Sequence, residues 1–489
     1  MQDPSDTLRA LQDYVTTSLD EHLARHATLD PAARALALFH RAARDMPAYA
    51  RFLAAAGIEP SDIAAATDLA RVPTTSKDQF LRVHPLGELA VGPADTVAVS
   101  SGSTGVPTYF PRGWRHELEV VWRFEQVFRD GIGAHVGTTL AVVCFPLGTW
   151  VGGMFTAACC RLLALKGYRL LVVTPGNQPP EIHRAVRELG PLHDRVVLLG
   201  YPPFLKDVID GAPDLDWGAR PLSLVLAGEV VSEAWRDILF ERCGRPGDIT
   251  RFAFSLYGTA DAGVLGVESS LCTAIRRFCA ERGDAADALF GSRRLPTLVQ
   301  YDPADRYFEA IGDDLVFTGE GGAIPLVRYA IGDTGGVVPY DTMLERLAAF
   351  GFEVPPGPSR RLPFVYVFGR RQHAVSFYGA NVFVEVVRLG LEHSELRGAF
   401  SGKLVMEVLE DAAGDSHLLL DVERARGGEG DDAALADAVA RRVVDALLAA
   451  SPEFGAYVPE ARRRPQVRVW AHGHPQHFPV GVKHRYVRA

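Results

Sequence analysis

From about position 96 onward, short apolar runs rich in Val and Leu alternate with longer segments whose apolar positions recur at helical spacing. Five of the short runs have the length of buried strands: 96–100, 139–145, 169–174, 195–199 and 222–227. Between them, the segment 114–130 carries Leu118, Val121, Phe124 and Phe128 three or four residues apart, which is typical of a helix that buries one face. Buried strands separated by helices predict a largely parallel sheet and an α/β core.

The segments outside this region follow other patterns. Residues 5–56 are Ala-rich and predict helices, whereas 67–78 form a polar, Pro-containing connector. The region 297–340 is richer in turns and short strands, as in the run 313–318. Residues 353–363 are rich in Pro, which is typical of a linker or of an extended approach to one.

The organisation changes again beyond residue 369. Two alternating runs, 403–409 and 417–423, predict an antiparallel hairpin, and a helix over 432–449 and a strand over 466–471 complete a small α+β unit. With 489 residues, the chain is too long for a single hydrophobic core. We therefore predict a domain boundary near 368–373, with one domain over 1–368 and a second over 369–489.

Bulk composition narrows the range of partners. The 51 basic and 60 acidic residues give a net charge of −9, which argues against a non-specific nucleic-acid binder. Six cysteines show no CxxC spacing, which favours a reducing compartment. An acidic start without a hydrophobic signal core, and the lack of an apolar stretch of about 18 residues, predict a cytoplasmic protein with no membrane partner.

The richest candidate for chemistry is the loop 100–107, which reads Ser-Ser-Gly-Ser-Thr-Gly-Val-Pro and follows the β-branched run 96–99. Its glycines let the backbone turn N–H groups toward a ligand, and its hydroxyls add further donors. This is the chemistry of a phosphate cradle, although no Lys lies inside it as in the GxxxxGK[ST] loop. A plain surface turn explains the same residues when the loop is considered alone.

A second motif, Tyr257-Gly258-Thr259-Ala260-Asp261, follows the apolar run 252–256. An aromatic ring, a tight glycine and a carboxylate at a strand end suit a nucleobase and a magnesium ion, which favours one or two carboxylates plus phosphate oxygens. The alternative is a strand-to-loop turn with a core Tyr.

Two further carboxylates occupy comparable positions. Glu229 follows the strand 222–227, and ligands in open α/β sheets bind at the carboxyl ends of strands. Asp333 directly follows Gly332, and a carboxylate that accepts two hydrogen bonds suits a ribose diol. A helix start explains Glu229 without a ligand, and an ordinary Gly-Asp turn explains Asp333.

Taken in order and spacing, these motifs resemble the adenylate-forming ligase superfamily, and specifically its phenylacetate–coenzyme A ligase-like branch. The resemblance covers most of the chain. It implies a large N-terminal domain with mixed and parallel sheets and a small mobile α+β C-terminal domain. Further segments contribute to it: 46–49, 57–63, 72–77, 152–153, 200–204, 369–370, 379–382 and 481–485.

The resemblance implies that ATP is held by residues from several motifs. The loop residues would surround its β- and γ-phosphates: Ser100, Ser101, Gly102, Ser103, Thr104 and Gly105. The strand-end motifs would contact the nucleoside and the α-phosphate: Glu229 beside the adenine, Tyr257 with Gly258 on its face, Thr259 at the α-phosphate, Asp333 with Arg370 at the ribose hydroxyls. Asp261 would help to hold Mg²⁺, and Lys483 would bridge the substrate carboxylate and the α-phosphate.

The family's two-step reaction follows from the same resemblance. An acid is activated with ATP as an acyl-adenylate, pyrophosphate leaves, and a thiol, first of all coenzyme A, takes the acyl group. Gly379 falls where the family lines its pantetheine tunnel. The resemblance places the acyl pocket at Trp150, Gly152, Gly153, Tyr201 and Phe204. The aromatic residues Trp150, Phe145, Tyr201 and Phe204 suggest an apolar pocket, and a hydrophobic core explains them equally well. The partner is then a small carboxylic acid, and pairing of two copies as a homodimer stays open.

Four features depart from the family pattern. Asp261 stands where the family has Glu, and Arg371, Gln372 and His373 stand where a hinge Asp is usual. The family's lysine in that loop is missing, with Ser376 near its place, and Lys483 follows Gly481 by two residues instead of one. The hinge change concerns the second step, so alternative acceptors stay open: a carrier-protein pantetheine, an amine or another nucleophile. A nucleotide-binding relative that has lost catalysis is a third reading.

One motif lies outside the resemblance. His472, His474 and His477 fall within six residues of a Gly- and Pro-containing segment, a composition that binds Zn²⁺ or Ni²⁺ in some proteins. A polar loop is the competing explanation.

Overall fold

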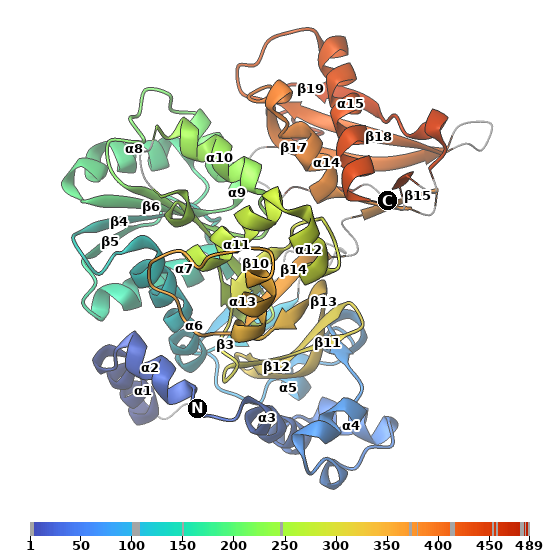
Figure 1. Ribbon diagram of the computed structural model, residues 1–489. Helices are drawn as coiled ribbons and strands as arrows, with labels where there is room; N and C mark the ends of the chain where they lie inside the picture. The colour runs from blue at the N-terminus through green and yellow to red at the C-terminus, as the bar shows by residue number, and fades with distance from the viewer. Residues whose placement is uncertain are drawn as a thin grey trace.

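The computed structural model describes residues 4–99, 108–148, 151–244, 248–370, 374–378, 380–410, 416–451, 454–455, 458–479, 484 and 486–487. Figure 1 shows N-terminal helices at one end, a large sheet with helices packed against it in the middle, and a C-terminal unit at the opposite end. Within the described residues, every helix is too short or too polar to cross a lipid bilayer.

The N-terminal segment is helical, as predicted for 5–56. Its helices are α1 (Pro4–Thr16), α2 (Leu19–His26), α3 (Pro31–Asp45) and α4 (Pro47–Ala55). Local sequence explains their starts: Ser18 and Glu21 form a capping box at α2, and Asp30 caps α3 ahead of a first-turn proline. The connector that follows contains η1 (Pro60–Asp62), η2 (Ala66–Arg71), β1 (Thr75–Ser76), η3 (Lys77–Leu81) and α5 (Leu86–Leu89).

The large sheet has twelve strands in the order β11-β12-β13-β14-β10-β9-β8-β7-β6-β4-β5, and β1 pairs with β13 beside this path. Its strands are β4 (Thr139–Val143), β5 (Leu170–Val173), β6 (Arg195–Gly200), β7 (Leu222–Ala227), β8 (Ala253–Thr259), β9 (Gly263–Val267), β10 (Thr297–Gln300), β11 (Arg306–Ile311), β12 (Asp314–Gly321), β13 (Ile324–Val338) and β14 (Phe364–Arg370). Strands β4 to β8 are parallel, and the pairs from β8 to β12 are antiparallel. The predicted mixed and parallel α/β fold is thus confirmed.

One predicted strand lies elsewhere. β2 (Thr96–Val99) does not join the large sheet and instead pairs antiparallel with β3 (Tyr109–Arg112). Because β2 is only partly buried, with Val97 41% exposed, it is a surface hairpin strand rather than a core strand. The run of β-branched residues predicted the strand correctly, but it could not show which partner the strand would take.

Helices cover both faces of the parallel strands, and further helices pack against the antiparallel strands β10 and β14. The first group is α6 (Trp114–Gln126), η4 (Val127–Ile132), α7 (Val151–Leu165), α8 (Pro179–Leu189), η5 (Gly190–Leu192), α9 (Pro202–Asp210), α10 (Glu233–Arg242) and η6 (Ile249–Arg251), and the second is α11 (Ser270–Glu281), α12 (Gly283–Phe290) and α13 (Tyr340–Ala348). Alternate residues of β4 enter different cores: Ala141 and Val143 pack with α6 and α7, and Leu140 and Val142 pack toward α8 to α10. Both faces are buried, which explains the continuous apolar runs in the sequence.

The C-terminal unit is built as the sequence predicted for 403–409, 417–423, 432–449 and 466–471. Its elements are β15 (Ala374–Phe377), β16 (Ala380–Phe383), α14 (Val384–Leu391), η8 (Ser394–Leu396), β17 (Phe400–Glu410), β18 (Ser416–Arg424), α15 (Asp432–Ala450), η9 (Glu460–Arg462) and β19 (Gln466–Trp470). β17 and β18 pair antiparallel, and β19 adds in parallel to β18. One hydrophobic core consists entirely of residues from Val375 onward.

A buried ion network holds β8 in place. Arg236 of α10 is fully buried and donates to Glu268 Oε1 over 2.8 Å, while Glu268 Oε2 accepts from the Ser255 backbone N–H in β8 over 2.8 Å. Burial alone would raise the pKa of Glu268, but the guanidinium groups of Arg236 and Arg276 hold it below its usual value. The carboxylate therefore stays charged and keeps its bond to the strand.

We expect Arg236→Met to destabilise the protein by about 3–5 kcal/mol, because it leaves a buried carboxylate without its main partner. The measurement is the midpoint of thermal unfolding. Arg9→Met is the matched control: Arg9 pairs with Asp6 at the surface, where ion pairs contribute little. Equal midpoints for the two variants would contradict the role of the network.

Candidate functional site

The carboxyl ends of β7 and β8 place two of the predicted motifs side by side. The two strands are parallel with Ala227 opposite Leu256, so 228–229, which follow β7, lie at the same edge of the sheet as 257–259, which end β8. Gly228 has a φ of 94°, in the left-handed region that favours glycine. The ring of Tyr201 lies 3.5 Å from the place that a Cβ at Gly228 would take. A side chain at 228 would thus meet Tyr201 only at ordinary van der Waals distance, and it is the positive φ that favours glycine here.

Tyr257 and Asp333 meet directly, although 76 positions separate them in the sequence. The Tyr257 hydroxyl donates to Asp333 Oδ2 over 2.9 Å, and both residues are buried. Arg370 on β14 lies opposite Asp333 on β13 in the antiparallel register. The structure therefore brings together three residues that the sequence predicted for the nucleoside.

The carboxylate of Asp261 forms an ion pair with a lysine. Lys77 Nζ lies 2.8 Å from Asp261 Oδ1, and the Tyr329 hydroxyl donates to Asp261 Oδ2. Lys77 reaches this point because β1 pairs in parallel with β13, with Thr75 opposite Tyr329, and the chain turns into η3 immediately afterwards. Asp261 is buried, whereas the Lys77 side chain is 20% exposed.

Lys77 was not predicted as a site residue. Its segment, 72–77, contributed to the family resemblance, but no role was assigned to the Lys that follows the polar Pro-Thr-Thr-Ser run at 73–76. Its place at Asp261 depends on a strand pairing across some 250 residues, and no local pattern predicts such a pairing.

The remaining residues of the second motif shape its turn. Thr259 Oγ1 accepts from the Ala262 backbone N–H over 3.2 Å and so closes the turn between β8 and β9. A Cβ at Gly258 would lie 2.7 Å from the Gly263 carbonyl oxygen, so only glycine fits. Arg112 from β3 donates to the Ala260 carbonyl over 2.6 Å. These contacts fix the backbone on which Tyr257 and Asp261 are presented.

Glu229 contacts the C-terminal unit. Arg388 of α14 donates to Glu229 Oε2 over 3.0 Å, and the Tyr486 hydroxyl lies 2.5 and 2.6 Å from the two carboxylate oxygens. Arg388 also donates to the Val230 carbonyl over 2.9 Å. Burial, reinforced by the nearby Glu229 carboxylate, raises the pKa of Tyr486, so this phenol stays a donor. The residue predicted beside the adenine thus holds the C-terminal unit against the strand ends.

A second contact lies next to it. The Ser232 hydroxyl donates to Glu392, whose other carboxylate oxygen is buried without a hydrogen bond among the described residues. Burial raises the pKa of Glu392 to about 7, even though the charge of Arg388 opposes this shift. Lys403 adds an ion pair to Asp207 of α9 at 2.8 Å. The C-terminal unit is therefore held by polar contacts, one of which prefers a protonated carboxyl.

The described residues predicted for the acyl pocket lie in two places, the start of α7 and the start of α9. Gly152 and Gly153 lie in the first turn of α7, where a Cβ at Gly153 would come within 2.3 Å of the Pro146 carbonyl oxygen. Tyr201 precedes α9 and faces Gly228. Phe204 is 7% exposed and packs in the core between the sheet and α8 to α10. The two glycines and Phe204 thus have packing roles in this structure.

Several predicted residues lie outside the described part of the chain. These are Ser100, Ser101, Gly102, Ser103, Thr104, Gly105, Trp150, Gln372, His373, Gly379 and Lys483.

The three C-terminal histidines are arranged around an indole rather than a common point. His477 stacks on Trp470 with ring centroids 3.7 Å apart, and His474 meets the same ring edge-on at 4.8 Å. His474 Nδ1 also lies 3.4 Å from the His477 backbone N–H, and His472 lies 3.7 Å from Glu423. The metal-site hypothesis for this segment has no support in the described residues.

Neither the protein-family models nor the curated proteins contain a match to this sequence. Solved structures do match its fold. A 2-hydroxyisobutyryl-CoA ligase in complex with 2-HIB-AMP and CoA gives a TM-score of 0.55 at 18% identity, covering 94% of this chain and 88% of that chain. An open conformation of the same ligase gives 0.54 at 16% identity, over 94% and 90%. The predicted fold of the adenylate-forming ligases is thereby confirmed along nearly the whole chain.

We expect Tyr486→Phe to loosen the C-terminal unit, because it removes the hydroxyl that bonds Glu229 and keeps the ring that lies against Arg388. The measurement is hydrogen exchange over α10 and α14, which should become faster. Tyr14→Phe is the matched control, since the buried Tyr14 hydroxyl has no hydrogen-bond partner in the described chain. Unchanged exchange in Tyr486→Phe would contradict the contact.

Attachment of the C-terminal unit should also weaken as pH rises. Burial raises the pKa of Glu392 from its ordinary value of 4.5 to about 7, so between about pH 4.5 and pH 7 detachment of the C-terminal unit releases a proton from Glu392. The contribution of Glu392 to attachment is therefore full below about pH 4.5 and is lost as the pH rises through about 7. A fluorophore pair on α8 and α15 measures the distance, and Glu392→Gln, which cannot ionise, should remove the pH dependence. A pH dependence retained in that variant would assign it to another group.

Proposed function

We propose that this protein activates a carboxylic acid with ATP as an acyl-adenylate, releases pyrophosphate, and passes the acyl group to a thiol, coenzyme A first of all. One observation carries the proposal: Tyr257 and Asp333 are hydrogen-bonded at the edge of the sheet, in the fold of a ligase whose structure contains an acyl-AMP and CoA. Strand ends of open α/β sheets are where ligands bind.

We assign binding of the nucleoside part of ATP to the buried residues Tyr257 and Asp333. The Asp333 carboxylate can accept both hydroxyls of a ribose, with the Tyr257 hydroxyl holding it in one orientation. The Tyr257 ring then offers an aromatic surface for the adenine. We assign Glu229 to positioning the C-terminal unit relative to this site, because its oxygens are engaged by Arg388 and Tyr486.

We assign the phosphates of ATP to Lys77 and Asp261. When a carboxylate attacks the α-phosphorus, two anions approach and charge builds on the leaving pyrophosphate, so fixed cations lower the barrier. Lys77 supplies one such cation from the described chain, and Lys483 is proposed as a second. The positive charge is in place before the substrate arrives, which avoids reorganisation during the reaction.

Asp261 fits the magnesium ion that the fold implies. Its Oδ1 is paired with the ammonium of Lys77 at 2.8 Å and its Oδ2 accepts from the Tyr329 hydroxyl, so a metal ion would share this carboxylate with Lys77. Mg²⁺ bound there would neutralise charge on the phosphates. Tyr329, by bonding Oδ2, orients the carboxylate for that task.

The test of the proposal is acid-dependent exchange of labelled pyrophosphate into ATP, with a panel of aryl, aliphatic and amino acids. We expect exchange with one class of acid and release of acyl-CoA when coenzyme A is added. Product formation with an amine or a carrier-protein pantetheine instead of coenzyme A would keep activation and replace the acceptor. ATP binding without exchange for any acid would overturn the proposal in favour of a nucleotide-binding protein.

We expect Asp333→Asn to raise the KM for ATP about 10–100-fold, since hydrogen bonds to a charged group contribute about 1.5–3 kcal/mol. The exchange assay at varied ATP gives the value. Asp314→Asn, an exposed carboxylate on the neighbouring β12, is the matched control and should leave KM unchanged. An equal effect in both variants would contradict ribose binding by Asp333.

We expect Lys77→Met to lower kcat of the exchange about 100- to 1,000-fold, the range found for loss of one preorganised donor to a transition state. Arg71→Met, an exposed cation in the same connector, is the control. A thermal midpoint for each variant separates loss of catalysis from loss of fold. A folded Lys77→Met protein with normal kcat would remove Lys77 from the reaction.

A further inference from the structure

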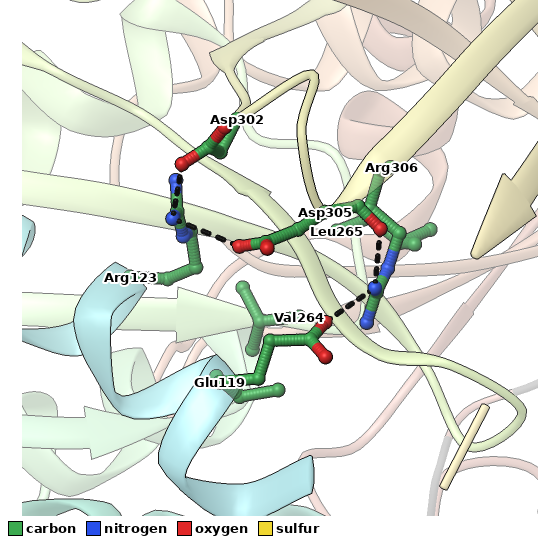
Figure 2. Close-up of a pocket in the computed structure, with 8 residues that line it drawn as sticks. Glu119, Arg123, Val264, Leu265, Asp302, Asp305 and Arg306 are labelled. Carbon is green, nitrogen blue, oxygen red and sulfur yellow. Dashed lines mark hydrogen bonds and ion pairs between the residues drawn. The ribbon is translucent and has the colours of Figure 1, made fainter. Parts of the chain in front are cut away.

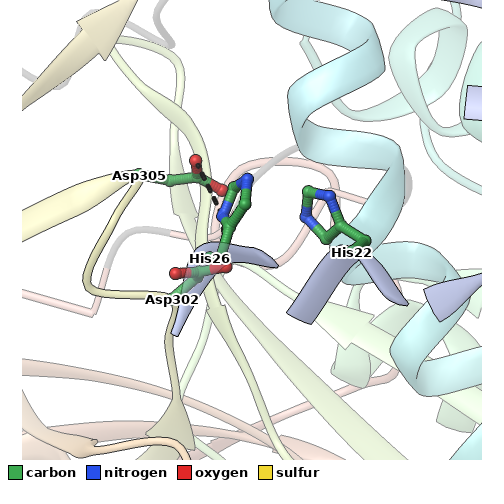
Figure 3. Close-up of side chains that lie close together, drawn as sticks. All are labelled: His22, His26, Asp302 and Asp305. Atoms are coloured by element: carbon green, nitrogen blue, oxygen red, sulfur yellow. Dashed lines mark hydrogen bonds and ion pairs between the residues drawn. The ribbon is translucent and has the colours of Figure 1, made fainter. Parts of the chain in front are cut away.

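A second group of ligand-type side chains lies outside the residues assigned to the nucleotide. His22 and His26 are four residues apart on α2, so they lie on one face of that helix. Asp302 and Asp305 come from the connection between β10 and β11. One nitrogen or oxygen from each of the four lies within 4.8 Å of those of the others. Figure 3 shows the two imidazole rings side by side, with the carboxylates beside His26.

The His22 ring is fixed by stacking, and one of its buried nitrogens makes no hydrogen bond within the described part of the chain. It stacks on Trp122 with centroids 3.9 Å apart and planes only 4° from parallel, which fixes its orientation. His22 is 7% exposed, and its Nε2 is buried without a hydrogen bond to any residue that the structure describes. Such a nitrogen costs free energy unless it finds a partner. The His26 ring follows at 3.9 Å.

The two carboxylates are also oriented by a guanidinium. Arg123 of α6 lies 3.0 Å from Asp302 Oδ2, the oxygen that also contacts His26, and 3.2 Å from Asp305 Oδ2, the oxygen turned away from the His26 contact, as Figure 2 shows for Arg123. The Asp302 carboxylate also accepts from the Ala304 backbone N–H over 3.0 Å. Hydrogen bonds of this kind typically orient the carboxylates that bind a metal.

Two of the distances between donor atoms bracket that of a tetrahedral ion, and all four atoms lie within 4.8 Å of one another. His26 Nδ1 is hydrogen-bonded to Asp302 Oδ2 over 2.9 Å and lies 3.7 Å from Asp305 Oδ1. Ligands about 2.0–2.1 Å from zinc lie about 3.4 Å from one another, between these two values. Two imidazoles and two carboxylates are a donor set that suits Zn²⁺.

We propose that His22, His26, Asp302 and Asp305 bind one Zn²⁺ ion as a structural site. All four ligands come from the protein, which is the hallmark of structural rather than catalytic zinc. The ion would join α2 to the connection between β10 and β11, segments separated by 276 residues from His26 to Asp302. It would thereby fix the N-terminal helices to the large sheet. The proposal is independent of the proposed function.

The test uses the full chain without an affinity tag, stripped with a chelator and then dialysed against Zn²⁺. Bound metal is measured by mass spectrometry. We expect one equivalent in the wild-type protein and none in His22→Gln or Asp305→Asn. The matched control is His474→Gln, which alters a histidine that packs on Trp470 and should keep the full equivalent. Arg123→Lys should weaken binding about 10–100-fold without abolishing it.

Two measurements keep the result decisive if a variant misfolds. Co²⁺ added to the stripped wild-type protein should give the intense visible absorption of a tetrahedral site, and Zn²⁺ should raise the thermal midpoint in a concentration-dependent way. Wild-type protein that retains no zinc after dialysis would overturn the proposal. So would a full equivalent that persists in folded His22→Gln and Asp305→Asn, since the metal would then lie elsewhere.

Discussion

The candidate site depends on one strand, β13. It carries Tyr329, which bonds Asp261, and Asp333, which bonds Tyr257, and it places Arg370 opposite Asp333. The same strand accepts β1 in parallel pairing and so brings Lys77 from the N-terminal region. A change in the register of β13 would disturb both ends of the site together, because a shift of one residue turns side chains to the other face.

The sequence predicted those parts of the molecule that follow from local patterns. The runs at 139–145, 195–199 and 222–227 became strands because residues buried on both faces must be apolar throughout. The family resemblance placed Tyr257 and Asp333 at the nucleoside, but it did not predict the hydrogen bond between them. Lys77 was missed because the pairing of β1 with β13 joins distant segments. The pairing of β2 with β3 is local, and it was missed because an apolar run does not show whether a strand joins the large sheet or a neighbouring strand.

Glu229 shows how one carboxylate can connect two parts of a protein. It follows the apolar strand β7, so its place at the sheet edge could be predicted from the sequence. Its partners could not, because Arg388 and Tyr486 lie more than 150 residues further along the chain. The buried carboxyl of Glu392 lies next to this contact, and a charged form there lacks full hydrogen bonding. Protonation and attachment of the C-terminal unit are therefore linked.

The contacts around one sheet edge come from widely separated parts of the chain, which has a consequence for synthesis on the ribosome. Lys77 is made before β13, and both are made before Arg388 and Tyr486. Until Arg388 and Tyr486 have been made, Glu229 lacks the guanidinium and the hydroxyl that contact it. These contacts therefore form only after most of the large sheet has been made, and a product that stops before Arg388 cannot reproduce them.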